Sequence, residues 1–99
     1  MAKHRQERIN AELRRVLSDI FMFDIPLQQD NIVSVIRVDT TKDLEEAKVY
    51  LSIFRNKEEV LKKLESSTPY IRHLIGQKMK IRRIQKLKFI VVDESSIIV

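Results

Sequence analysis

Residues 47–54 read Ala-Lys-Val-Tyr-Leu-Ser-Ile-Phe, and this stretch decides the fold. Its apolar side chains alternate with Lys48, Tyr50 and Ser52. A period of two in hydrophobicity predicts a β-strand that has one buried face and one solvated face. The stretch therefore predicts one strand of a sheet that keeps a face open to solvent.

Two further strands are predicted on either side of this stretch. Residues 32–38 are rich in β-branched side chains and predict a strand. The turn-forming residues 39–43 connect this strand to the one at 47–54, and because the connection is short, an antiparallel hairpin is expected. Residues 86–92 predict a third strand. One face of that strand is apolar and the other is basic, the two sets being Leu87, Phe89 and Val91 and, opposite them, Lys86 and Lys88.

The remaining segments show helical periodicity. Residues 3–23 carry an apolar stripe at helical spacing, and Pro26 is expected to end that helix. A second helix is predicted from the cap Asn56 to Ser66 or Ser67, and a third begins at once with Thr68 as its N-cap and Pro69 as its first residue. The predicted order is α-β-β-α-α-β, an α+β fold with two helices joined at a kink.

Composition limits the classes of protein to which the chain can belong. Its 99 residues are 43% hydrophobic, which suits one domain over residues 1–99 with a short C-terminal extension, 94–99. It contains no cysteine, which suits a reducing compartment. It has no apolar run long enough for a secretory signal or a membrane span, and Glu7 and Glu12 argue against a transit peptide, so a cytoplasmic protein without membrane contact is expected.

The positive charge is concentrated in one part of the chain. Formal net charge is +5, and residues 72–88 contain no acid at all. A basic stretch of this kind indicates a polyanionic partner such as nucleic acid, although a merely solvated basic face is an equally good explanation. The basic residues of the stretch are Arg72, Lys78, Lys80, Arg82, Arg83, Lys86 and Lys88.

One line of residues in the third helix could reach phosphate. Arg72, Gly76 and Lys80 are spaced by four and so fall on one side of a helix. Gly76 is the only glycine, and within a helix it indicates either close packing, the simpler explanation, or close approach of the backbone to a ligand. Arg5 and Arg8, in the first helix, are expected to form a secondary contact.

No pattern typical of catalysis is present in the sequence. One glycine excludes the phosphate-cradling loops, and His4 and His73 have no partner at metal-ligand spacing. Two carboxylate pairs, at positions 39 and 43 and at positions 93 and 94, are explained by turns and solvation. We therefore expect a protein that is not an enzyme and that uses no metal, cofactor or small-molecule substrate.

Several short motifs, taken in order, resemble the ribosome-binding factor A family. They are Arg-Gln-Glu-Arg-Ile at 5–9, Thr-Lys-Asp-Leu at 41–44, Ala-Lys-Val-Tyr at 47–50, Tyr-Ile-Arg at 70–72, Arg-Arg at 82–83, Leu87 and Phe89, and Asp-Glu-Ser at 93–95. The resemblance implies a KH-like fold of the second type, with helices on one side of a three-stranded mixed sheet. It also implies binding to the small ribosomal subunit and its ribosomal RNA, assistance in late maturation and in processing of the 5′ end of that RNA, and a role in cold adaptation.

The chain departs from the family at the kink between the paired helices. An ordinary KH domain has a Gly-x-x-Gly loop there, and the family has an Ala-x-Gly kink, whereas this chain has Ser67, Thr68 and Pro69. Leu-Gln-Gln at 27–29 also stands where relatives often have Asp-Pro-Arg. The chain therefore has no bare glycine backbone at this kink.

The leading hypothesis is an RNA-binding maturation factor that acts as a monomer. Its expected RNA contacts are Arg72, Gly76, Lys80, Arg82, Arg83, Lys86 and Lys88, with Arg5 and Arg8 added by the first helix. Another KH-like RNA-binding protein is one alternative. A second is a protein-interaction module that uses a strand edge or the apolar residues 97–99.

Overall fold

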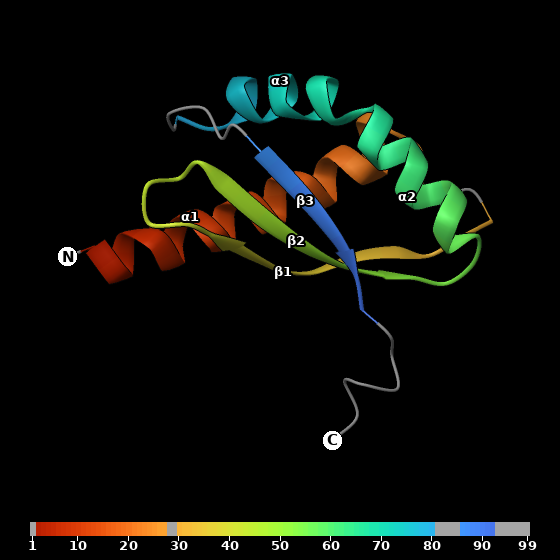
Figure 1. The fold of residues 1–99 in the computed structure, drawn as a ribbon. Coiled ribbons are helices and arrows are strands. Elements are labelled where there is room, and N and C mark those ends of the chain that lie inside the picture. Colours follow the sequence, from red (N-terminus) through yellow and green to blue (C-terminus); the bar gives the residue numbers. More distant parts are fainter. Residues whose placement is uncertain (1, 28–29, 81–85, 93–99) are drawn as a thin grey trace.

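The computed structural model describes residues 2–27, 30–80 and 86–92 (Figure 1). The chain begins with helix α1, Ala2–Asp19, which continues into a π-helical turn, η1, Ile20–Asp24. Strands β1, Val33–Thr40, and β2, Glu46–Ile53, follow. Helices α2, Lys57–Ser66, and α3, Thr68–Lys78, lead to strand β3, Lys86–Val91.

The three strands form one mixed sheet in the order β1-β2-β3. The hairpin strands β1 and β2 are antiparallel, whereas β3 lies parallel to β2 on its other edge. In Figure 1, α1 passes behind the strands, and α2 and α3 bring the chain back to the start of β3. Element order, mixed sheet and the joined helix pair confirm the predicted KH-like fold of the second type.

The core lies between the helices and one face of the sheet. The inward side chains of β2 are almost completely buried, with exposures of 0% for Ala47, Val49 and Leu51. Leu13 and Leu17 of α1 are equally buried, as expected from the apolar stripe of that helix. The second strand and the first helix are therefore the two apolar surfaces that the remaining elements cover.

Strand β1 runs two residues further than predicted and contains a bulge. The register with β2 shifts between Val35 and Arg37, so Ile36 is the extra residue. A bulge lets two side chains three positions apart face the same side, which explains why Val35 and Val38 are both buried. The turn was expected from residue 39, but Asp39 still belongs to the strand.

The joint between α2 and α3 differs from the prediction by one residue. Ser67, with φ −93° and ψ 1°, is both the C-cap of α2 and the N-cap of α3, so the prediction that Thr68 is the N-cap was wrong. The Thr68 hydroxyl instead donates a hydrogen bond of 3.0 Å back to the carbonyl of Leu64. Pro69 lies in the first turn of α3, where a missing N–H leaves no helical hydrogen bond unmade. Asn56 is the N-cap of α2 in the left-handed conformation, but its side chain makes no capping hydrogen bond.

The end of β1 is fastened to α1 by one amide side chain. Asn10 Oδ1 accepts hydrogen bonds from the Thr40 backbone N–H, at 3.1 Å, and from the Thr40 hydroxyl, at 2.6 Å. Thr40 is the one buried polar side chain among the described residues. Gln6 Nε2 donates to the carbonyl of the same threonine. The first helix and the hairpin are thus held in register by polar contacts at this end.

We predict that Asn10→Ala destabilises the protein because it leaves two buried donors of Thr40 without an acceptor. The free energy of unfolding should fall by about 1–3 kcal/mol, measured by chemical denaturation. Asn10→Asp keeps the acceptor oxygen and is the matched control, for which a much smaller loss is expected. Equal losses in both variants would contradict this role of Asn10.

Candidate nucleic-acid interface

Lys80 lies beside the N-terminal half of α1. Arg5, Arg8, Ile9, Glu12 and Lys80 line one shallow depression of about 290 Å³. On α1, Arg5, Arg8 and Glu12 are spaced by three and four residues and so share a face. Met79, which is buried, anchors the chain next to Lys80. Three cations thus surround one carboxylate. We call Arg5, Arg8 and Lys80 the helix-side cluster.

The prediction that Arg72, Gly76 and Lys80 lie on one side of the same helix was wrong for Lys80. Helix α3 ends at Lys78, and Met79 is extended, with φ −128° and ψ 144°. Lys80 therefore leaves the helix and reaches α1, where it joins Arg5 and Arg8. Lys80, predicted as a main RNA contact, therefore lies beside Arg5 and Arg8, which were predicted as secondary RNA contacts.

Lys78 is engaged by a distant carboxylate. Its Nζ lies 3.5 Å from Oδ2 of Asp24, an oxygen that is buried and has no hydrogen-bond partner among the described residues. The contact joins the end of α3 to the end of η1. Lys78 therefore has an acidic partner within the fold.

Arg72 and Gly76 are exposed on α3. A Cβ atom built on Gly76 meets nothing within 4 Å, and the residue has no positive φ. The simpler expectation for this glycine, close packing inside the protein, is therefore wrong for the part of the chain that the structure describes. Neither backbone strain nor an internal neighbour explains a glycine here.

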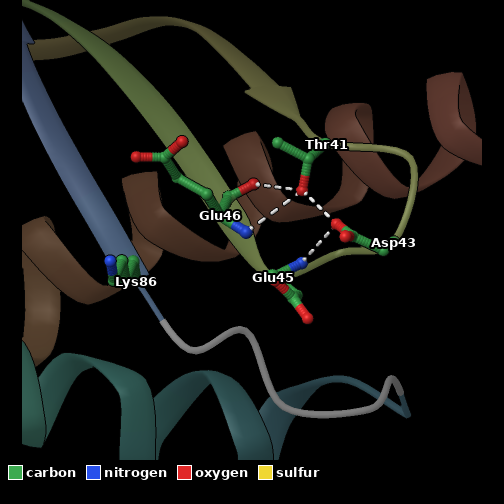
Figure 2. A pocket seen from close by; sticks show the side chains of 5 residues that line it. All are labelled: Thr41, Asp43, Glu45, Glu46 and Lys86. Carbon is green, nitrogen blue, oxygen red and sulfur yellow. Dashed lines mark hydrogen bonds between the residues drawn. The ribbon is translucent and has the colours of Figure 1, made fainter.

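Lys86 lies in an acidic surrounding, as Figure 2 shows. It lines a depression of about 250 Å³ together with Thr41, Asp43, Glu45 and Glu46. Three acids therefore share this depression with Lys86, so the positive potential there is lower than the sequence stretch alone suggested. Arg82 and Arg83, also predicted contacts, lie outside the described residues.

Asp43 organises the hairpin loop above Lys86. Its carboxylate accepts hydrogen bonds from the Thr41 hydroxyl, at 2.7 Å, and from the Glu45 N–H, at 3.2 Å (Figure 2). These bonds, that of Thr41 foremost, lower the pKa of Asp43 from its usual 3.8 because they favour the charged form. Leu44 follows with φ 61°, a conformation that a leucine adopts only when its surroundings hold it.

The carboxylates considered for catalysis have structural partners. Asp39 pairs with Arg37 across 3.1 Å, and Asp43 binds its own loop; positions 93 and 94 lie outside the described residues. Within residues 2–27, 30–80 and 86–92, no group of three or more His, Cys, Asp or Glu side chains could hold a metal ion. The same residues include no helix that is long and apolar enough to cross a membrane.

Sequence reasoning missed a second group of side chains on the open face of the sheet. The Arg37 guanidinium lies over the ring of Tyr50, 4.4 Å from its centre, and that of Arg55 lies 5.0 Å from the centre of the Phe54 ring. The position of Tyr50 on the solvated face of its strand was the available signal. The arginines could not be assigned to it before the strand register was known.

Comparison with known proteins supports one family throughout. The family model of ribosome-binding factor A matches residues 5–97. A ribosome-binding factor A of Clostridium botulinum is 46% identical over 96% of the chain and 82% of the relative. That of Clostridium tetani is 44% identical over 83% of the chain and 71% of the relative.

Solved structures share the fold at lower identity. The crystal structure of ribosome-binding factor A from Thermus thermophilus has a TM-score of 0.78 at 22% identity and covers 87% of this chain and 94% of its own. A Thermus thermophilus homology model, fitted into a cryo-electron-microscopy map of a complex of the factor with the 30S subunit, has a TM-score of 0.70 at 24% identity, over 82% of this chain and 88% of its own.

The lowered pKa of Asp43 predicts how the hairpin loop responds to acid. Because the folded pKa lies below the unfolded value of 3.8, the stabilisation by the charged form is present above that value and is lost as pH falls through the folded pKa. Asp43→Asn keeps an acceptor oxygen but cannot titrate. Its free energy of unfolding should therefore fall less than that of the parent chain between neutral and acid pH, as measured by denaturation at each pH, and an equal fall would contradict the role given to this carboxylate.

Proposed function

The chain belongs to the ribosome-binding factor A family, and from this premise we propose that it binds the small ribosomal subunit and assists late maturation of its RNA. The observation that carries the proposal is the meeting of Lys80 with Arg5 and Arg8 in one depression. Ribosomal RNA is a polyanion, and cations brought together from separate elements can contact neighbouring phosphates. The relatives named for ribosome binding, and the factor fitted into a 30S complex, support this partner.

The helix-side cluster is the proposed centre of the RNA contact, with Arg72 and Gly76 of α3 extending it along the exposed side of that helix. Phosphate neutralisation releases counterions, so the affinity of such a surface falls as salt rises. Arg82 and Arg83 follow Lys80 by two and three residues in the chain and are proposed to add to the same contact. Lys88 faces the open side of the sheet, and Lys86 contributes least because carboxylates surround it.

The finer proposal is that the protein acts by occupancy in the cytoplasm, as a monomer. It would hold an intermediate of the ribosomal RNA while nucleases process the 5′ end, and the need for it would be greatest in the cold, where misfolded RNA escapes slowly. Support comes from the family resemblance.

One observation favours a second function, a protein-interaction module. Met22 and Phe23, adjacent in the π-helical turn, are 60% and 76% exposed. Exposed apolar side chains next to each other are typical of protein contacts. The salt dependence of binding separates the two functions, since an apolar protein contact loses little affinity as salt rises.

We predict that the variant Arg5→Gln, Arg8→Gln, Lys80→Gln binds small subunits more weakly in co-sedimentation. The slope of log affinity against log salt should become shallower by about 2 to 3, because each of three lost phosphate contacts removes roughly 0.7–0.9 from it. The control, Lys57→Gln, Lys62→Gln, Lys63→Gln, removes the same charge from exposed positions of α2. Equal weakening in both variants would contradict a specific role for the helix-side cluster.

Gly76→Ala tests whether RNA approaches the backbone of α3. Alanine is the better helix former, and the new methyl group meets nothing within 4 Å, so the free energy of unfolding should rise by up to about 1 kcal/mol. Affinity for small subunits should nevertheless fall, because the methyl group stands in the way of the RNA. Gln77→Ala, at the exposed neighbouring position, is the control, and unchanged affinity of Gly76→Ala would remove this residue from the contact.

A further inference from the structure

The face of the sheet that points away from the core carries its own pattern of side chains. Residues of β2 that alternate with the buried ones, among them Lys48 and Tyr50, point to this side, and the register places Arg37 of β1 and Ile90 of β3 beside Tyr50. Ile32 and Phe54 continue the pattern beyond the strand ends. There the Phe54 N–H donates a hydrogen bond of 2.9 Å to the Ile32 carbonyl. These two side chains are 62% and 60% exposed.

Two arginine–aromatic pairs stand on this face. Arg37 covers the ring of Tyr50, and Arg55 covers that of Phe54, with guanidinium carbons 4.4 and 5.0 Å from the ring centres. Tyr50 and Phe54 lie in one chain segment, about 13 Å apart at roughly 3.3 Å per residue. Aromatic rings and guanidinium planes at such intervals are surfaces on which unpaired bases stack.

Basic side chains outnumber acidic ones on this face. Lys48 and Lys88 are direct partners in the parallel register and are both exposed, an arrangement that like charges disfavour. None of the ion pairs between described residues involves either lysine. Two acids share this face: Asp39, the register partner of Lys48, pairs with Arg37, and Glu46 is the register partner of Lys86. A polyanion bound across the two lysines would remove their repulsion.

We propose that this open face of the sheet binds a single-stranded segment of RNA, whose bases stack on the Arg37–Tyr50 and Arg55–Phe54 pairs while Lys48 and Lys88 contact its phosphates. The inference rests on the proposed function for the source of the RNA, the ribosomal RNA of the small subunit. A duplex hides the faces of its bases within its own stack, so an aromatic surface selects unpaired RNA. The helix-side cluster, lacking aromatic side chains, has no such selectivity.

The two RNA surfaces are separate. The helix-side cluster lies where the N-terminal half of α1 meets the end of α3, whereas the stacking face belongs to the side of the sheet that α1 does not cover (Figure 1). One molecule can therefore contact two RNA segments at once. Such a contact would hold a single-stranded segment next to the region that the helix-side cluster occupies.

The tyrosine content of the chain provides a direct reporter. The protein has two tyrosines and no tryptophan, so Tyr70→Phe, a change on α3 outside both proposed surfaces, leaves Tyr50 as the sole source of tyrosine emission. Titration with a short oligouridylate should quench this emission to saturation. The fully paired duplex of the same length should not.

Variants in the Tyr70→Phe background locate the contact. Phe54→Ala should weaken oligouridylate binding roughly five-fold or more, the usual loss when one stacking side chain is removed. Phe23→Ala, which removes an exposed ring from η1, is the matched control and should bind as the parent does. Lys48→Gln with Lys88→Gln should make the salt slope shallower by about 1.4, at roughly 0.7 per phosphate of a single strand. Phe54 and Phe23 are both exposed, so neither substitution removes a core contact. Thermal unfolding checks that each variant is folded.

Failure of this inference and failure of the proposed function are distinguishable. Absent quenching, equal quenching by duplex, or equal affinities of Phe54→Ala and Phe23→Ala would overturn the stacking face, even if small subunits still co-sediment with the protein. Saturable quenching that depends on Phe54 would support the stacking face, even if the chain failed to bind small subunits and the proposed function were lost.

Discussion

The parallel pairing of β3 with β2 is the constraint on which the rest of the structure depends. Strand β2 is central, its inward side chains are fully buried, and both its edges are paired. A tight turn can join antiparallel strands, but a parallel neighbour requires the chain to return to the end of the sheet at which β2 began. Helices α2 and α3 make that return, and the single cap residue Ser67 between them keeps the crossover compact. The return delivers Lys80 to α1 and thereby builds the helix-side cluster.

The same crossover decides which basic residues keep their charge unopposed. The stretch 72–88 has no acid in sequence, yet carboxylates from other elements meet it in space: Asp24 reaches Lys78, and the hairpin loop surrounds Lys86. Lys80 meets one carboxylate and two arginines instead. Local sequence charge is therefore a poor guide to local potential here, because the tertiary fold selects where the positive potential remains.

Much of the fold followed from periodicity, since each predicted strand and helix has a strong apolar pattern that a single face can bury. The sequence could not place the bulge at Ile36, because an extra residue in a strand is defined by its partner strand. Nor could it separate Ser67 from Thr68 as the cap, since both residue types cap helices and only the path of the preceding helix decides. Lys80 fitted a helical line as long as the end of α3 was unknown, and Met79, which takes the extended conformation and is buried, moved it to another surface.

The side chains proposed to bind RNA are those that the core does not need, and this separates binding from stability. Exposed ion pairs such as Arg37 with Asp39 contribute little to folding, but the same guanidinium also lies over the Tyr50 ring, so two contacts hold it at the open face. A side chain that is already ordered loses less conformational entropy when a ligand binds. Arg37 therefore lies at the open face with its guanidinium over an aromatic ring. The fold achieves this because β1 and β2 pair in a register that the buried residues on the opposite face dictate.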